Sequence, residues 1–225
     1  MERHFDAELS DLKKDILYMG SLVEGAILNS LEALKALSND KAEKVIKDDK
    51  IIDEWELKLD EECLDLLALR QPMAVDLRFI TMAMKISTDL ERMADLAVDI
   101  AQRVQELADR PLLKPLIDIP KLALVAQEMT KGVIESFLNS DVELAKAIIL
   151  RDKEADNLRN SVQDELLNDY ILKDKKTIPR AIPLLLIARH LERICDHATN
   201  IAEDVIYMIQ AKVVKHHPEK LGNGG

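Results

Sequence analysis

The sequence predicts an all-α protein, an elongated tandem duplication of an antiparallel three-helix bundle with six long helices. Hydrophobic residues make up 48% of the chain but aromatic residues only 3%, so small aliphatic side chains must form the core, as in helical bundles. Only 6 glycines and 7 prolines occur in 225 residues, which leaves little turn chemistry for a β fold. The third observation is an internal repeat, which predicts the duplication.

The repeat is clearest in two acidic segments. Residues 90–101 read LERMADLAVDIA and residues 191–202 read LERICDHATNIA, with seven of twelve positions identical at an offset of 101 residues. A second match joins residues 49–53, DKIID, to residues 152–156, DKEAD. The repeated unit is therefore about 100 residues long, which is enough for three helices.

Each half divides into three predicted helices. Ser38-Asn39-Asp40 indicates a break followed by a helix N-cap, and Asn139-Ser140-Asp141 copies it in the second half. Pro72 ends the second helix because proline disfavours the α conformation at the preceding Gln71. The polar segment 173–177 makes the corresponding turn in the second half. The predicted helices span residues 5–37, 41–69, 75–108, 121–138, 142–171 and 179–211.

A proline-rich segment in the middle of the chain predicts the boundary between the halves. It contains Pro111, Pro115 and Pro120. Short connections elsewhere make successive helices antiparallel neighbours. The predicted organisation is a first bundle over residues 1–109, a linker over 110–120, a second bundle over 121–214 and a flexible tail over 215–225.

Apolar residues in the third and sixth predicted helices recur in alternating steps of four and three. This heptad spacing predicts long helices packed at about 20°. Helices of about 30 residues are roughly 45 Å long, so the molecule should be elongated. The seam residues are Ile86, Leu90, Met93, Ala97, Ile100, Val104 and Leu107, and Ile187, Leu191, Ile194, Ala198, Ile201, Val205 and Met208.

Charge and composition exclude several classes of partner. The net charge of −11 repels nucleic acid and anionic membranes. The longest apolar run, residues 182–188, is too short to cross a bilayer, and the first six residues lack the apolar segment of a secretory signal. Cys63 and Cys195 have no paired spacing, which fits a reducing compartment. We therefore expect a cytoplasmic protein without membrane insertion.

The acidic residues of the repeat form stripes. Glu91, Asp95 and Asp99 lie four residues apart, on one face of a helix, as do Glu192, Asp196 and Asn200. Like charges at this spacing destabilise a helix by roughly 0.2–0.5 kcal/mol per pair. A bound cation would offset that cost. A purely solvated acidic face, serving solubility alone, is the alternative.

Counting residues from the turns places the acidic motifs at matching heights. Asp49 lies about as far before the turn at Pro72 as Asp95 lies after it, given 1.5 Å per helical residue. By the same argument, Asp53 and Glu91 lie at the same height along the two helices. In the second half, the same holds for Asp156 and Asp196 and for Asp152 and Asn200. Two carboxylate clusters are predicted, one per bundle.

These clusters are candidate metal sites. Oxygen donors suit Mg²⁺, Ca²⁺, Mn²⁺ or iron, in mononuclear or multinuclear sites, rather than zinc. The stripes lie away from the heptad seam, so the sites should be shallow, solvent-facing grooves. The candidate ligands are Asp49, Asp53, Glu91, Asp95, Asp99, Asp152, Asp156, Glu192, Asp196 and Asn200.

Other polar residues receive ordinary structural roles. Arg92 and Arg193 can each pair with the aspartate three residues on, and His197 is expected to be a satisfied surface histidine. His190 is expected to be an ordinary helix residue, and Trp55 to lie in the core. The chain has no glycine-rich phosphate loop, Ser/His/Asp order or CxxC, so we predict no catalytic residue, no organic cofactor and no enzymatic activity.

Taken together, the motifs resemble the PhoU family of phosphate-signalling accessory proteins over essentially the whole chain. In that family a glycine and a histidine often flank the central aspartate, whereas here Ala94, Leu96 and Cys195 stand at such positions. The motifs that carry the resemblance are Asp49xxxAsp53, Arg70-Gln71-Pro72xxxAsp76-Leu77-Arg78, Leu90-Glu91-Arg92xxAsp95, Asp152xxxAsp156 and Leu191-Glu192-Arg193xxAsp196-His197-Ala198xxAsn200-Ile201-Ala202-Glu203.

The resemblance implies two three-helix bundles whose acidic motifs hold metal ions, sometimes as multinuclear iron clusters. It also implies a non-enzymatic negative regulator of phosphate uptake and phosphate-starvation signalling. The implied partners are the ATPase subunit of a phosphate ABC transporter and a phosphate-sensing histidine kinase. We further expect a homodimer.

Two other functions are compatible with a helical acidic protein. A ferritin-like di-metal carboxylate protein needs Glu-x-x-His on two helices, and no histidine of this chain has a glutamate three residues before it. A metal-free helical scaffold is the other.

Overall fold

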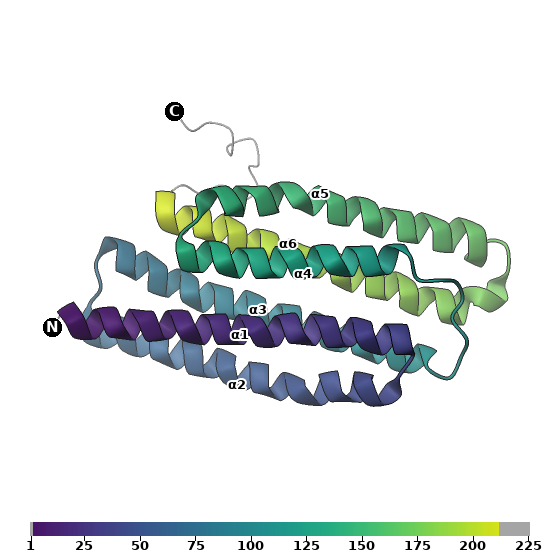
Figure 1. Cartoon of the computed structure of the whole chain (residues 1–225), viewed down its shortest axis with the longest axis horizontal. Helices are drawn as coiled ribbons and strands as arrows, with labels where there is room; N and C mark the ends of the chain where they lie inside the picture. The colour runs from purple at the N-terminus through teal and green to yellow at the C-terminus, as the bar shows by residue number, and fades with distance from the viewer. Residues whose placement is uncertain (1, 212–225) are drawn as a thin grey trace.

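A computed structural model describes residues 2–211, which form six long helices and contain no strand (Figure 1). The predicted all-α, duplicated and elongated architecture is confirmed. The second bundle also contains a π-helical turn, η1, and a 3₁₀ turn, η2. The elements are α1 (Glu2–Ala36), α2 (Asn39–Arg70), α3 (Ala74–Leu107), α4 (Asp118–Asn139), α5 (Val142–Glu165), η1 (Leu166–Ile171), η2 (Lys175–Thr177) and α6 (Ile178–Gln210).

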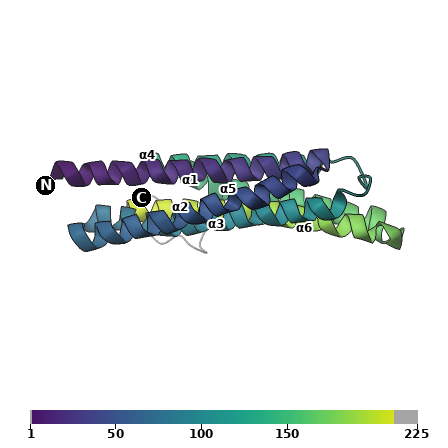
Figure 2. The ribbon, with the colours of Figure 1, turned by 90° about the horizontal axis from the view of Figure 1, so that it is seen from below.

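The two bundles pack side by side along their length. Within each bundle the three helices are antiparallel, and α1 packs against α4 while α3 packs against α6. Figure 2 shows α1 and α4 in one layer and α3 and α6 in the other. The outer helix α2 packs on α1 and α3, and α5 packs on α4 and α6. The four inner helices therefore join the bundles into one body.

One continuous hydrophobic core runs through both bundles. All fourteen residues of the two predicted heptad seams are buried, including Leu90 on α3 and Leu191 on α6. Cys63 and Cys195 are free and buried among the core residues, and burial raises the pKa of the Cys63 thiol to about 12. The core confirms the heptad prediction.

The helix ends follow the predicted signals. Ser38 caps α2 by accepting a hydrogen bond from the backbone N–H of Lys41 at 3.3 Å. Asp141 caps α5 by accepting from two backbone N–H groups at 3.0 Å. Gln71 ends α2 in the left-handed conformation, with φ at 48°, and Pro72 follows it.

Three predicted boundaries differ from the structure. Helix α1 begins at Glu2 rather than at residue 5. Helix α4 begins at Asp118 rather than at residue 121, because Pro120 falls in its first turn, where a proline removes no helical hydrogen bond. The predicted helix over 142–171 stops being α-helical at Glu165 and continues as the wider turn η1. There the N–H of Leu172 donates to the carbonyl of Leu167, five residues back, at 3.0 Å. The predicted tail over 215–225 lies outside the described residues.

Trp55 is half-buried and packs against the edge of the core, whereas the prediction placed it inside the core. Its ring lies 4.6 Å from that of Tyr18, and the Lys58 ammonium sits 3.9 Å above it. These contacts place the indole on the α1–α2 surface. No helix within residues 2–211 is both long and apolar enough to cross a membrane.

Two glycines on α1 offer a matched test of the packing against α4. A Cβ on Gly20 would lie 2.4 Å from Cδ1 of the buried Ile134, whereas a Cβ on Gly25 would meet nothing within 4 Å. We expect Gly25→Ala to stabilise the protein by about 0.5–1 kcal/mol through helix propensity. Gly20→Ala should destabilise it by about 1 kcal/mol, because overpacking exceeds that gain. Urea unfolding of both variants measures the difference, and equal stability would contradict the close α1–α4 approach.

Candidate metal centres

The first acidic cluster lies between α2 and α3. Burial, followed by the charges of Asp53 and Asp95, raises the pKa of Asp49 to about 6. Burial, Asp95 and Glu56 likewise raise the pKa of Glu91 to about 7, although Arg92 opposes the shift. These charge contributions show that the carboxylates of the two helices lie within electrostatic range of one another. The structure therefore brings together the residues that were predicted to share one height.

The second acidic cluster lies between α5 and α6. Burial raises the pKa of Asp152 to about 6, with contributions from Asp196, Asp156 and Glu192. The pKa of Asp196 is also raised, by burial and then by Glu192 and Asp156, while His197 and Arg193 lower it. The duplicated motifs thus form equivalent clusters in the two bundles.

Both clusters sit at the border between core and solvent. Asp49, Glu91 and Asp152 are half-buried, whereas Asp53 and Asp95 are exposed. The predicted position outside the heptad seam is correct, and each cluster forms a shallow, solvent-facing arrangement.

Two predicted ligands stand apart from the rest. The carboxylate of Asp99 raises the pKa of Asp95, yet its own Oδ2 lies 3.6 Å from Nδ1 of His190 on α6. Nδ1 of His190 is buried and makes no hydrogen bond within the described part of the chain. Asn200 is half-buried and makes no hydrogen bond to any residue among 2–211. Asp99 therefore lies between the first cluster and α6.

The donor chemistry of the clusters fits hard cations. Carboxylate oxygens bind Mg²⁺, Ca²⁺, Mn²⁺ and iron, and raised pKa values mark repulsion that a cation would relieve. Within residues 2–211, no three His, Cys, Asp or Glu side chains converge closely enough, as they stand, to hold one ion. Binding would require the carboxylates to rotate toward a common centre, so the metal sites stay a prediction.

The two clusters differ in charge. Arg159 lies within the second cluster, with Nη2 at 3.3 Å from Glu192 and 3.9 Å from Asp156. The offset of 103 residues that relates Asp49 to Asp152 relates Glu56 to Arg159. Glu56 adds negative charge to the first cluster, where it helps to raise the pKa of Glu91. The first cluster is therefore the more strongly negative of the two.

Polar contacts also join the bundles along α3 and α6. Nδ1 of His197 lies 2.8 Å from Asp89, and Nζ of Lys85 lies 2.7 Å from Asp204. His197 was predicted to lie at the surface, but it is half-buried in this interface. His190 faces Asp99 across the same interface. Leu96, the counterpart of His197 in the first half, is buried.

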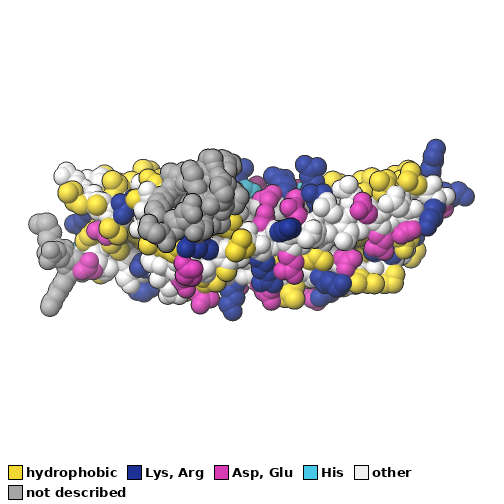
Figure 3. Space-filling view, turned by 90° about the horizontal axis from the view of Figure 1, so that it is seen from above, with side chains coloured by type: hydrophobic (Ala, Val, Ile, Leu, Met, Phe, Trp, Pro, Cys, Tyr) yellow, Lys and Arg dark blue, Asp and Glu magenta, His cyan; other side chains and the backbone are white. Residues whose placement is uncertain are grey.

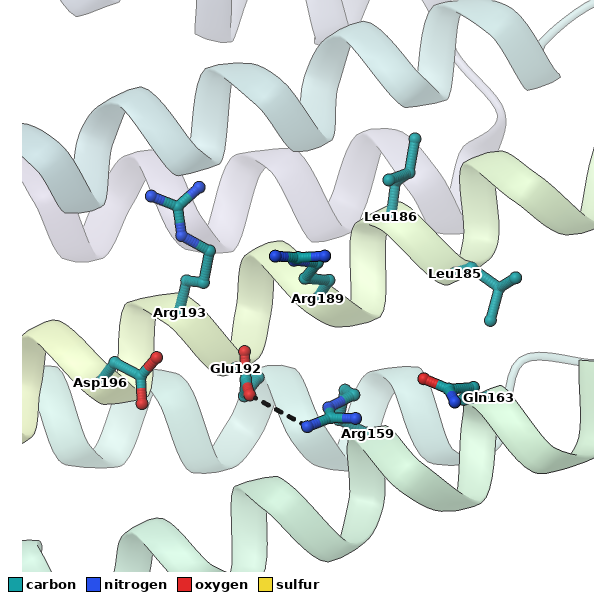
Figure 4. Close-up of a pocket in the computed structure, with 8 residues that line it drawn as sticks. All are labelled: Arg159, Gln163, Leu185, Leu186, Arg189, Glu192, Arg193 and Asp196. Atoms are coloured by element: carbon teal, nitrogen blue, oxygen red, sulfur yellow. Dashed lines mark hydrogen bonds and ion pairs between the residues drawn. The ribbon is translucent and has the colours of Figure 1, made fainter.

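The predicted pairs between Arg92 and Asp95 and between Arg193 and Asp196 do not close into ion pairs, although each arginine lowers the pKa of its aspartate. Neither arginine makes an ion pair within the described residues. Figure 4 shows the side chain of Arg193 extending away from Asp196. Arg92 and Arg193 are both exposed to solvent.

A groove beside the second cluster was not predicted from the sequence. Its volume is about 590 Å³, and α5 and α6 supply its walls (Figure 4). The signal that could have revealed it is the change from Glu56 to Arg159 between the repeats. The lining residues are Arg159, Gln163, Leu185, Leu186, Arg189, Glu192, Arg193 and Asp196.

The family model described as the PhoU domain matches the chain twice, over residues 16–104 and 119–205. The chain belongs to the PhoU family. The first match lies within α1–α3 and the second within α4–α6, so each bundle corresponds to one copy of the domain. The resemblance inferred from the acidic motifs is confirmed.

Proteins similar to this PhoU-family chain match it over nearly their full length. The "Phosphate-specific transport system accessory protein PhoU homolog" of Aquifex aeolicus is 42% identical over 209 residues, covering 93% of this chain and 94% of that protein. The crystal structure of PhoU from Pseudomonas aeruginosa has a TM-score of 0.88 at 34% identity, covering 92% of this chain and 100% of that one. The phosphate transport system regulatory protein PhoU from Streptococcus pneumoniae has a TM-score of 0.87 at 30% identity, covering 93% and 99%.

The raised carboxyl pKa values predict how the stability of the metal-free protein depends on pH. A pKa raised in the folded state means that the folded protein binds protons more tightly than the unfolded chain, so stability falls as pH rises from about 4 through about 6. We expect the melting temperature in EDTA to be higher at pH 5.5 than at pH 8. Asp49→Asn and Asp152→Asn should each flatten this dependence and raise stability at pH 8.

Asp48→Asn is the matched control for that experiment. Asp48 is an exposed neighbour of Asp49 on the same helix, so its neutralisation should leave the pH profile as it is. Identical profiles for Asp48→Asn and Asp49→Asn would show that neither burial nor the neighbouring carboxylates raise the pKa of Asp49.

Proposed function

We propose that this chain is the accessory and regulatory protein of a phosphate-specific transport system. Its role would be negative regulation of phosphate uptake and phosphate-starvation signalling, by coupling a phosphate ABC transporter to a phosphate-sensing histidine kinase. The observation that carries the proposal is membership of the PhoU family across both bundles. The names of similar full-length proteins, accessory or regulatory proteins of phosphate transport, support it.

The proposed mode of action is binding rather than catalysis. Six helices joined by one continuous core make a stiff body with long exposed faces, suited to contacting two partners at once. The partners would be the ATPase subunit of the transporter and the kinase. Both would meet the protein in the cytoplasm, and the protein would act there as a homodimer.

We further propose that each acidic cluster binds divalent or iron cations. The first centre would use Asp49 and Asp53 from α2 with Glu91 and Asp95 from α3, and Asp99 at its edge. The second would use Asp152, Asp156, Glu192 and Asp196, with Asn200 at its edge. A bound cation would supply positive charge that cancels the repulsion between helices. It would thereby stiffen the faces presented to partners.

The ferritin-like alternative has little support. Its sites lie inside a four-helix bundle and use Glu-x-x-His from two helices. Here the carboxylate clusters lie at the solvent border between an outer and an inner helix of each bundle. The metal-free scaffold is the alternative that experiment must exclude.

Metal binding predicts a metal-dependent gain of thermal stability. At a Mn²⁺ concentration about 100 times the dissociation constant, one site stabilises the folded protein by about 2.7 kcal/mol. We expect Asp49→Asn/Asp95→Asn to lose the contribution of the first centre, and Asp152→Asn/Asp196→Asn that of the second. Calorimetric melting with Mn²⁺ and with EDTA, together with elemental analysis of the purified protein, measures both effects.

Glu61→Gln/Asp65→Asn is the control, because it removes two exposed acids of α2 outside the clusters. If this variant lost as much of the Mn²⁺ effect as the cluster variants, the ions would be binding the acidic surface in general. A wild-type protein with no metal and no Mn²⁺ effect would favour the scaffold.

The regulatory role predicts direct association with the transporter. Purified transporter ATPase subunit should co-purify with the wild-type protein in pull-down experiments. It should bind less of the Asp49→Asn/Asp95→Asn variant if the metal centre shapes the docking face. Lack of association both with Mn²⁺ and with EDTA would argue against the adaptor function.

A further inference from the structure

We infer that the groove between α5 and α6 binds a phosphate-type oxyanion carried by a small molecule, with Arg189 and Arg193 as its main contacts. The groove shares Glu192 and Asp196 with the second acidic cluster, but the ligand inferred for it is an anion. It rests on the arginines that line a cavity of about 590 Å³ and does not require the proposed metal centres.

Two of the three arginines in the groove have free guanidinium groups. Arg189 and Arg193 make no ion pair or hydrogen bond with any residue among 2–211. They lie four residues apart on α6, a spacing at which like charges repel. Arg193 acts electrostatically on Asp196 but forms no ion pair with it, so both guanidinium groups keep their hydrogen-bond donors for a ligand. A bound anion would also relieve the repulsion between the two arginines.

The arrangement of the groove places positive charge on both of its walls. Figure 4 shows Arg189 and Arg193 extending from α6 on one side of Glu192, and Arg159 approaching Glu192 from α5 on the other. Gln163, one turn further along α5, adds amide donors at the rim. Seen over α5 and α6, acidic and basic side chains interleave along the middle of this face (Figure 3).

Comparison of the repeats indicates that the basic groove belongs to the second half alone. At the offset of 101 residues, Arg189 corresponds to Thr88 and Arg193 to Arg92. At the offset of 103, Arg159 corresponds to Glu56 and Gln163 to Asp60. Both halves have the acidic motifs. At the groove, however, the second half has two arginines and a glutamine where the first half has two acids and a threonine.

The side chains that line the groove indicate which kind of ligand it binds. Guanidinium groups bind phosphate oxygens in bidentate fashion, and two of them can share the charge of one tetrahedral dianion. Leu185 and Leu186 form an apolar part of the wall. A cavity of this size falls in the range of roughly 300–1,000 Å³ that holds small-molecule ligands. The groove therefore accepts free phosphate or a phosphate ester.

The nearby carboxylates Glu192 and Asp196 oppose an anion in this groove. Arg159 already offsets one of them, at 3.3 Å from Glu192. A cation in the second acidic cluster would neutralise both, so Mn²⁺ should tighten phosphate binding, and phosphate should tighten Mn²⁺ binding by the same factor. This coupling, unlike the site itself, rests on the proposed metal centre.

The test is isothermal titration calorimetry of the full chain with inorganic phosphate, with adenosine monophosphate and with acetate, in EDTA and again with saturating Mn²⁺. We expect phosphate or the monophosphate to bind more tightly than acetate and to weaken as salt is added. Arg189→Gln/Arg193→Gln should weaken binding about tenfold or more, since each charge-assisted hydrogen bond contributes a similar factor.

Lys41→Gln/Arg110→Gln removes the same charge from exposed positions outside the groove and outside both acidic clusters, and should bind as the wild type does. Circular dichroism and melting of both double variants check that they fold. Absence of phosphate and monophosphate binding under both metal conditions would overturn the inference. So would equal weakening by the two double variants, or acetate binding as tight as phosphate binding. Equal phosphate affinity with and without Mn²⁺ would support the anion site while counting against the metal coupling.

Discussion

The burial of the heptad seams of α3 and α6 in the shared core is the constraint on which the rest of the structure depends. Both seams are wholly buried, so the rotation of each helix about its axis is fixed by its apolar face. Once that rotation is fixed, the acidic stripes of α3 and α6 must lie at the solvent border beside α2 and α5. The same packing places His197 against Asp89 and Lys85 against Asp204 at the joint between the bundles. The buried apolar residues thus determine which face of each helix, with its charged side chains, lies at the surface.

The carboxylate clusters lower the stability of the folded protein. Side chains of Asp49, Glu91 and Asp152 hold their protons to unusually high pH because burial and neighbouring acids disfavour their charge. Burial of the apolar seams supplies enough stabilisation for the helices to stay together despite this repulsion. A protein whose helices are held by apolar packing can thus present unpaired charge to cations, anions or partner proteins. That property suits a PhoU-family protein, which would act by binding.

Duplication has given two similar bundles with different electrostatics. Glu56 makes the first acidic cluster more negative, and Arg159 at the corresponding place makes the second more nearly balanced. Arg189 and Arg193 then add a basic groove next to the second cluster. The two halves therefore offer chemically distinct surfaces on one stiff body.

The sequence alone determined the helical class, the duplication, the heptad seams and the presence of acidic residues at matching heights. These features are local or periodic, and the rise per residue converts spacing directly into position. Tertiary structure decided what lies opposite each side chain. It turned Arg193 away from Asp196, set Asp99 beside His190 and joined Arg159, Arg189 and Arg193 in one groove. These contacts depend on how two helices pack and on which rotamers the side chains adopt. The spacing of residues along one helix contains neither kind of information.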